Sequence, residues 1–331
     1  MKTGLSGALW QTTRAFLAMI ACAFATAVPT LAQDYPAQLI RLVVPYPPGG
    51  STDIVARNFA ALLTKELGQN VLVENRPGAA TNIGADAVAK ARPDGYTLLF
   101  GTSGQVLNPI FGPVPPFDLM NLLDPVSPVV RVPFIVAAHK DAPFSTPREL
   151  VAAARASPGK FSISSPQLDL YVDLLKSRAG IDLLHVTYKG GAAAATDAIS
   201  GQVNMVYALV PVLIPQLQGG RLKALGVASN RRLAVLPGVP TFVEAGIDYE
   251  ATVWFGLLAP AGTPKTILNR LSQATQKIAE SAAFTDKLTP IGAVAVSATP
   301  EEFRAQLVAE TAFWQQVAKS MPHLVAPDAK K

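Results

Sequence analysis

Two short loops contain the residue types of this sequence that could do chemistry. The first is Pro48-Gly49-Gly50-Ser51-Thr52-Asp53 and the second is Gly101-Thr102-Ser103-Gly104. Each loop follows an apolar run typical of a buried strand, and the first loop also opens a helical pattern. Glycines leave backbone N–H groups accessible, and the N-terminus of a helix attracts anions. The loops therefore indicate an anion-binding site, and the alternative is that both are only tight turns.

Signatures of catalysis and of metal binding are almost absent. The sequence has three histidines, His139, His185 and His323. They do not pair at metal-ligand spacing, and no nucleotide-binding glycine motif is present. Gly101-Thr102-Ser103-Gly104-Gln105 resembles the nucleophile elbow of hydrolases but has Gln105 in place of its last glycine. We expect no catalytic residue, no metal and no cofactor, and a hydrolase that uses Ser103 is the remaining enzymatic alternative.

The elements around the two loops predict that the loops meet. Strands are expected at 39–44, 71–73 and 96–100, and helices at 52–67 and from Thr81 or Asn82 to Ala91. This alternation demands parallel strands with right-handed crossovers. In a doubly wound sheet with strand order 2-1-3, ligands bind at the carboxyl ends of strands one and three. Both loops are expected at that point.

The rest of the chain repeats the alternation of strands and helices. Strands are expected at 134–138, 161–164, 184–188, 203–208, 222–227 and 253–259. Helices are expected at 147–157, 168–179, 192–200, 265–284 and 300–320. The segment 108–133 contains seven prolines and suits an irregular crossing between two lobes.

The first 32 residues have the pattern of a signal peptide. Lys2 and Arg14 are the only charges before residue 34, and residues 15–28 carry none. Those fourteen residues span about 21 Å as a helix, which is short of the ~30 Å hydrocarbon core of a bilayer. Small residues precede the expected cleavage site after Ala32, so the mature chain is predicted to begin at Gln33.

Two alternatives to cleavage after Ala32 remain: an uncleaved anchor, or a lipid-modified Cys22. Cys22 is the only cysteine, so the mature chain would have none, which is compatible with a bacterial periplasm. Loss of Lys2 and Arg14 leaves 26 basic residues against 23 acidic ones, a net charge of +3. That charge is too small, and the basic residues too dispersed, for a nucleic-acid-binding protein.

Six motifs occur in the order in which a known family has them. They are Ile40-Arg41-Leu42-Val43-Val44-Pro45-Tyr46-Pro47-Pro48-Gly49-Gly50-Ser51-Thr52-Asp53, Glu74-Asn75-Arg76-Pro77-Gly78-Ala79, Pro93-Asp94-Gly95-Tyr96-Thr97-Leu98-Leu99, Val186-Thr187-Tyr188-Lys189-Gly190, Leu236-Pro237-Gly238-Val239-Pro240-Thr241 and Trp254-Phe255-Gly256-Leu257-Leu258-Ala259-Pro260-Ala261-Gly262-Thr263-Pro264. The chain resembles the periplasmic receptors of tripartite tricarboxylate transporters, the Bug-type receptors, from Tyr35 to about Ser320.

The resemblance implies a fold of two doubly wound α/β lobes around a ligand cleft, similar to periplasmic binding proteins. Lobe 1 would comprise 35–132 and 253–331, and lobe 2 would comprise 133–252. A monomeric receptor for a small carboxylate is implied, with the membrane subunits of a tripartite-type transporter as partners. A receptor that serves a membrane sensor kinase is the alternative. The site residues expected are Pro48, Gly49, Gly50, Ser51, Asp53, Ala79, Thr102, Ser103, Ser164, Ser165, Gly190 and Tyr207. Asp53 would mainly hold the loop and its waters, since a carboxylate repels an anion.

One segment departs from the family pattern. Ser164-Ser165-Pro166-Gln167-Leu168-Asp169-Leu170-Tyr171 stands where the family has a glycine-rich turn and a histidine. Pro166 has no N–H and a fixed φ, so it cannot direct an amide at a ligand as a glycine does. Leu168, Leu170 and Tyr171 are expected to bring apolar or aromatic surface near the same rim, so we expect an acid with one carboxylate and an apolar or aromatic tail. The alternative is that Leu168 and Leu170 face the core of the second lobe.

Overall fold

The computed structural model describes residues 35–112, 118–166, 169–188 and 190–325. The signal-peptide prediction, with Cys22 and the cleavage site after Ala32, falls outside these ranges. The residues from Gln38 onward form one compact unit. Among the helices in the described ranges, none has the length and apolarity needed to cross a membrane.

The first group of strands has the predicted 2-1-3 order. β1 (Ile40–Val44) pairs in parallel with β2 (Val71–Asn75) and with β3 (Thr97–Thr102), and β9 (Thr252–Pro260) adds to β3 in antiparallel. The connecting elements are α2 (Ser51–Leu67), η1 (Ala79–Thr81), α3 (Asn82–Ala89), α4 (Gly104–Phe111) and α5 (Leu119–Leu122). The carboxyl ends of β1 and β3 therefore lie side by side, as the sequence predicts.

Helix α2 follows directly from its apolar spacing. Val55, Phe59, Leu63 and Leu67 recur at intervals of four and are buried, which places them on one helix face against the sheet. Gly68 ends the helix with φ +69°, and its N–H donates to the carbonyl of Thr64. A glycine is favoured there because the left-handed conformation carries no Cβ penalty.

The crossing at 108–133 is more regular than predicted. A single strand, β4 (Leu123–His139), occupies much of the segment expected to be irregular, and it pairs with β9 along Leu123–Pro133. Pro125 and Pro128 are tolerated because the register shifts between Pro125 and Ser127 and again between Pro128 and Val130. A proline at a bulge removes no ladder hydrogen bond, so a high proline content does not exclude a strand here.

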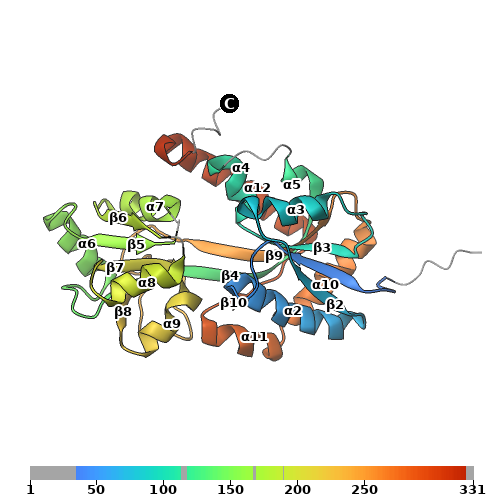
Figure 1. Ribbon diagram of the computed structural model, residues 1–331, viewed down its shortest axis with the longest axis horizontal. Coiled ribbons are helices and arrows are strands. Elements are labelled where there is room, and N and C mark those ends of the chain that lie inside the picture. The colour runs from blue at the N-terminus through green and yellow to red at the C-terminus, as the bar shows by residue number, and fades with distance from the viewer. Residues whose placement is uncertain (1–34, 113–117, 167–168, 189, 326–331) are drawn as a thin grey trace, which may run out of the picture. The chain divides into compact units, whose positions relative to one another are not determined.

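The second group of strands begins where β4 leaves β9. Phe134 to His139 of β4 pair with β7 (Met205–Leu209) on one side and β8 (Leu222–Val227) on the other. β5 (Ser162–Ser165) pairs in parallel with β7 and with β6 (Leu184–Thr187). Four helices accompany these strands: α6 (Pro147–Ala156), α7 (Asp169–Ala179), α8 (Gly191–Ile199) and α9 (Val210–Gln218). Figure 1 shows β4 and β9 running between the two groups of strands.

The last part of the chain packs on the first group. It contains α10 (Lys265–Ala279), α11 (Ala282–Leu288), η2 (Thr289–Ile291), β10 (Val294–Ala295), α12 (Pro300–Ser320) and η3 (Pro322–Leu324). α10 and α11 contact α2, and α12 contacts β4 and α4. The single helix predicted at 265–284 is two helices, because the Ser281 side chain accepts from the Phe284 N–H and caps a new helix.

Candidate functional site

A cavity of about 410 Å³ lies between the loop that precedes α2 and the second group of strands. Its lining has a polar side on the first group and an apolar side that draws on both groups. The lining residues are Tyr46, Pro47, Pro48, Gly50, Ser51, Thr52, Phe134, Pro166, Gly191, Leu209, Val212, Val253 and Phe255. We call this the front cavity. Among the residues that the structure describes, no Lys, Arg, His, Asp or Glu lines it.

The N-terminus of α2 faces the front cavity without a side-chain cap. Gly50 occupies the N-cap position, and its carbonyl accepts from the N–H of Ile54. Gly50, Ser51 and Thr52 all line the cavity. The first N–H groups of a helix have no partner within the helix, and they carry its partial positive charge. This end of α2 can therefore receive an anionic group.

Asp53 holds the loop that shapes this end of the helix. Its carboxylate is 3% exposed and accepts from the Gly49 N–H at 2.9 Å, from Arg57 Nε at 3.0 Å and from Asn75 Nδ2 at 2.9 Å. Gly49 has φ +84°, a conformation that favours glycine. Burial alone would raise the pKa of Asp53, but the hydrogen bonds from Arg57, Gly49 and Asn75 outweigh it and lower that pKa. Asp53 is thus a paired anion behind the loop and does not line the cavity.

Thr102 supports the same loop from β3. Its hydroxyl lies 3.0 Å from the hydroxyl of Tyr46 and accepts from the Gly104 N–H at 3.1 Å. Its own N–H donates to Gln105 Oε1 at 2.6 Å. Burial raises the pKa of Tyr46, so the phenol stays neutral. Tyr46 lines the front cavity and Thr102 fixes its position.

Ser103 is buried and already engaged. Its Oγ accepts from the Trp254 backbone N–H at 3.2 Å, which ties β3 to β9. A serine nucleophile needs a base that accepts its proton. None of the three histidines forms a hydrogen bond with Ser103 in the described part of the chain.

Ala79 lies in an unusual turn beside these loops. Ala79, Ala80 and Thr81 have φ of +46°, +49° and +80°, values that are uncommon for residues with a Cβ. Two side chains of α4 hold the turn: Asn108 Nδ2 donates to the Ala80 carbonyl, and Gln105 Nε2 donates to Thr81 Oγ1 at 3.1 Å. Ala79 is exposed and is not among the residues that line the front cavity.

The residues expected from the second group lie at different depths. Ser164 is fully buried, with its Oγ 2.9 Å from the carbonyl of Ala194. Tyr207 is also fully buried, and its hydroxyl lies 2.6 Å from that of Tyr249. Gly190 is the N-cap of α8, and no side chain caps that helix either. The next residue, Gly191, lines the front cavity.

Ser165, His185 and Asp169 have the atom order of a hydrolytic triad. Ser165 Oγ lies 2.8 Å from His185 Nε2, and His185 Nδ1 lies 3.3 Å from Asp169 Oδ1. Ser165 has no exposed surface, however, so a substrate cannot reach its Oγ. Burial lowers the pKa of His185 despite the nearby carboxylate of Asp169. The contacts tie β5, β6 and the start of α7 together.

The apolar wall of the front cavity was not found from the sequence. Phe134 of β4 and Val253 and Phe255 of β9 line it, together with Leu209 and Val212 near α9. These residues occur in apolar runs without any polar signal. Tyr171, expected near the rim, is buried in the core with its ring centroid 4.6 Å from that of Phe134. Leu170 also packs against the core, and Leu168 falls outside the described residues.

The site has no residues suited to a metal. Within the described ranges, no three His, Cys, Asp or Glu side chains gather as metal ligands would. What it offers is hydrogen-bond donation from two helix N-termini, α2 on one side and α8 on the other, with hydroxyl groups and an apolar wall between them. That combination suits a small anion with an apolar body.

Comparisons with known proteins agree with this geometry. The family model described as tripartite tricarboxylate transporter family receptor matches residues 55–321. Protein BugT of Bordetella pertussis is 34% identical over 313 residues, covering 92% of this chain and 96% of BugT. An R. palustris protein solved with adipate is 33% identical with a TM-score of 0.74, covering 86% of this chain and 98% of its own. MatC from Rhodopseudomonas palustris, solved with bound malate, is 28% identical with a TM-score of 0.71, and the match covers 86% of this chain and 99% of MatC. The chain belongs to the family of tripartite tricarboxylate transporter receptors.

Proposed function

We propose that this protein is a periplasmic receptor that captures a small carboxylate in the front cavity and passes it to a tripartite-type uptake system. The observation that carries the proposal is the pair of uncapped helix N-termini, those of α2 and α8, at one cavity whose described lining includes no charged side chain. Backbone N–H groups at helix N-termini bind carboxylates through hydrogen bonds and the helix dipole. The adipate and malate bound to two relatives support the same ligand class.

The two groups of strands would act as lobes, comprising 35–132 with 253–331 and 133–252. Two connections support these boundaries: β4 changes partners between Pro133 and Phe134, and β9 begins at Thr252. Ligand bound between walls that belong to different lobes would favour a closed arrangement. The receptor would work as a monomer and perform no chemistry on its ligand, in line with the engaged Oγ of Ser103.

The lining also supports a ligand with an apolar tail. Leu209, Val212 and Val253 are partly exposed in the cavity and would be left facing water by a fully polar ligand, while the buried Phe134 and Phe255 back this wall. Pro166 lines the cavity on the side of the second group and has no N–H to offer. An acid with one carboxylate near α2 and an aliphatic or aromatic tail against this wall satisfies both features.

A thermal-shift panel tests the proposal. The panel contains benzoate, hexanoate, adipate, malate, citrate and glutamate, each added to the purified mature protein. A ligand at a hundred times its dissociation constant adds roughly 2.7 kcal/mol of stability, which raises the midpoint by a few degrees. We expect the largest shift with the monoacids. Shifts with citrate or malate alone would refute the apolar-tail specificity, and no shift with any acid would refute the receptor function.

Export completes the proposal. The receptor would be cleaved after Ala32 and released as a soluble protein beginning at Gln33. Intact-mass measurement of the protein from a periplasmic extract tests this, and a mass that begins at Cys22 with added acyl chains would identify a lipoprotein instead.

A further inference from the structure

The ribbon formed by β4 and β9 separates the front cavity from a second hollow surface. Along β9, Val253 and Phe255 line the front cavity, while Thr252 and Trp254 line the opposite side. Along β4, Phe134 faces the front and Arg131 faces the back. Successive side chains of a strand point to opposite faces, so the alternation is what a two-strand ribbon between two cavities requires.

Three adjoining cavities form this second surface, which we call the back groove. Their volumes are about 340, 310 and 370 Å³. The first and second share Arg131 and Glu250, and the second and third share Arg231 and Val294. Because neighbouring cavities share lining residues, they adjoin one another, and together they extend over a longer surface than any one of them. It draws on β4, β9, β10, α12 and the loop after β8.

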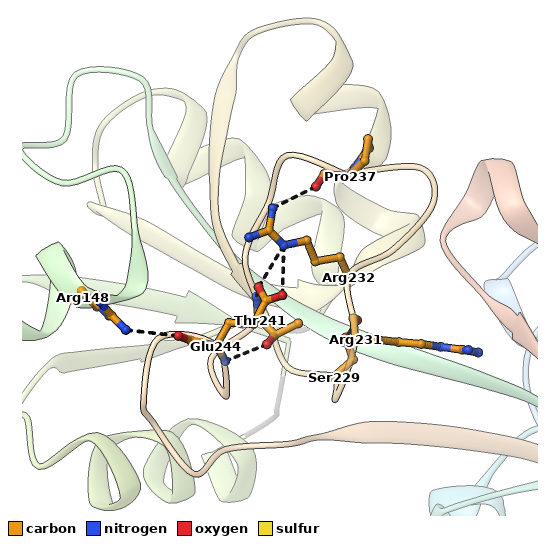
Figure 2. A network of polar contacts seen from close by, with 7 residues as sticks. All are labelled: Arg148, Ser229, Arg231, Arg232, Pro237, Thr241 and Glu244. Carbon is orange, nitrogen blue, oxygen red and sulfur yellow. Dashed lines mark hydrogen bonds and ion pairs between the residues drawn. The ribbon is translucent and has the colours of Figure 1, made fainter.

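Arg231 is held by its backbone, and its side chain has no partner among the residues that the structure describes. Its carbonyl accepts from Ser229 Oγ at 2.7 Å. The next residue, Arg232, turns the other way and donates from Nε to both oxygens of Glu244, at 3.1 and 2.9 Å. Thr241 holds Glu244 in turn, by accepting from its N–H at 3.0 Å. Figure 2 shows the side chain of Arg231 extending away from this network.

The positive charge at the back groove is therefore available to a partner. Within the described part of the chain, Arg231 forms no side-chain hydrogen bond or ion pair, and Arg131 reaches only Gln306 Oε1, at 3.5 Å. Both side chains are exposed. Of the two acids in the groove, Glu310 accepts from Trp254 Nε1 at 2.7 Å, and burial raises its pKa. The other acid, Glu250, lines the same two cavities as Arg131.

We propose that the back groove is a docking surface for an extended, acidic segment of the membrane partner protein, with acidic side chains placed on Arg131 and Arg231. The proposal rests on the receptor function proposed above. The length of the groove favours a chain segment over a small anion, and two exposed guanidinium groups without a carboxylate partner in the described part of the chain favour acidic side chains. The groove includes residues of both groups of strands. A partner bound there therefore contacts both groups and can distinguish one relative arrangement of the groups from another.

Charge reversal separates docking from ligand binding. Arg231→Glu and Arg131→Glu are compared with Arg221→Glu, which changes an exposed arginine outside the groove. The probe is the radiolabelled acid that stabilises the wild-type protein most in the panel above. Its dissociation constant is measured on each purified variant by calorimetry, and its uptake is measured in cells that express each variant in place of the native receptor.

We expect unchanged ligand affinity in all three variants. Uptake should fall about tenfold or more in the two groove variants, because like charges across an interface oppose association strongly. Uptake equal to that of Arg221→Glu would overturn the proposal. So would loss of ligand affinity in the purified groove variants, because the arginines would then serve the front cavity. Binding of inorganic phosphate that Arg231→Glu abolishes would overturn it in favour of a small-anion site. Absence of acid binding by the wild-type protein would instead refute the receptor function itself.

Discussion

Asp53→Asn is the substitution whose effect the structure specifies most fully. The carboxylate accepts from three donors that belong to different segments: the Gly49 N–H, the Arg57 guanidinium and the Asn75 amide. An asparagine keeps one acceptor oxygen and places an amide donor where a second acceptor stood. At least one hydrogen bond to a charged group is lost, and one buried donor faces another. Hydrogen bonds to charged groups contribute about 1.5–3 kcal/mol each, so we expect a loss of about 3 kcal/mol in the free energy of unfolding.

Urea unfolding and thermal unfolding of the ligand-free protein measure this loss. A change of this size lowers the thermal midpoint by about 6 °C for a domain of a few hundred residues. The control is Asp248→Asn, which removes a carboxylate that is 92% exposed and pairs with Arg178 at 2.9 Å on the surface. Exposed ion pairs contribute little, so the control should unfold as the wild type does. Equal midpoints for the two variants would refute the role assigned to Asp53.

Three further predictions concern the same site and the start of the chain. The pKa of Asp53 is lowered on folding, so the stability that its carboxylate contributes is complete above the unfolded pKa of about 3.9 and is lost as pH falls through the folded pKa. The difference in stability between the wild type and Asp53→Asn should therefore close in acid, as urea titrations from pH 7 downward will show. Gly50→Val should keep the fold, since φ of Gly50 is −76° and the nearest atom to a new Cβ is the Pro47 carbonyl oxygen at 3.8 Å. It should nevertheless lower the affinity for the acid about tenfold or more, because the side chain fills the space at the α2 N-terminus. The control is Gly238→Val, whose Cβ meets nothing within 4 Å and which should bind normally; calorimetry and circular dichroism compare the two variants. Ser103→Ala should leave acid affinity within about twofold, because Ser103 supports the β3–β9 contact and does not line the cavity, and calorimetry would contradict this with a larger loss.

The loops of the first group could be predicted because their signals are local. The positions of Gly49, Gly50 and Ser51 after an apolar run, followed by a helical pattern, give the turn, the helix start and the place in the sheet together. The same segment predicts that Asp53 holds the loop rather than the ligand, since a carboxylate repels an anion. These inferences depend on neighbours within a few residues, so no knowledge of distant contacts is needed.

The apolar wall of the front cavity could not be predicted, because it is made by strand register. Whether Phe134 faces the cavity or the opposite side depends on one residue of register between β4 and β9, where Pro133 pairs with Thr252. The bulges near Pro125 and Pro128 change that register, and the sequence gives no means of placing them. Tyr207 shows the same limit: its phenol meets that of Tyr249, a partner 42 residues away.

Under the receptor function proposed above, the arrangement of the two walls would couple ligand binding to the relative arrangement of the two groups of strands. The α2 N-terminus belongs to the first group of strands, and Gly191 and Val212 belong to the second. A ligand that touches both adds its binding free energy to one relative arrangement of the groups and not to others. By reciprocity, anything that binds preferentially to that arrangement at the back groove must raise ligand affinity by the same factor by which ligand raises its own. The β4–β9 ribbon contributes one face to each of the two sites, so it connects the ligand site to the proposed docking surface.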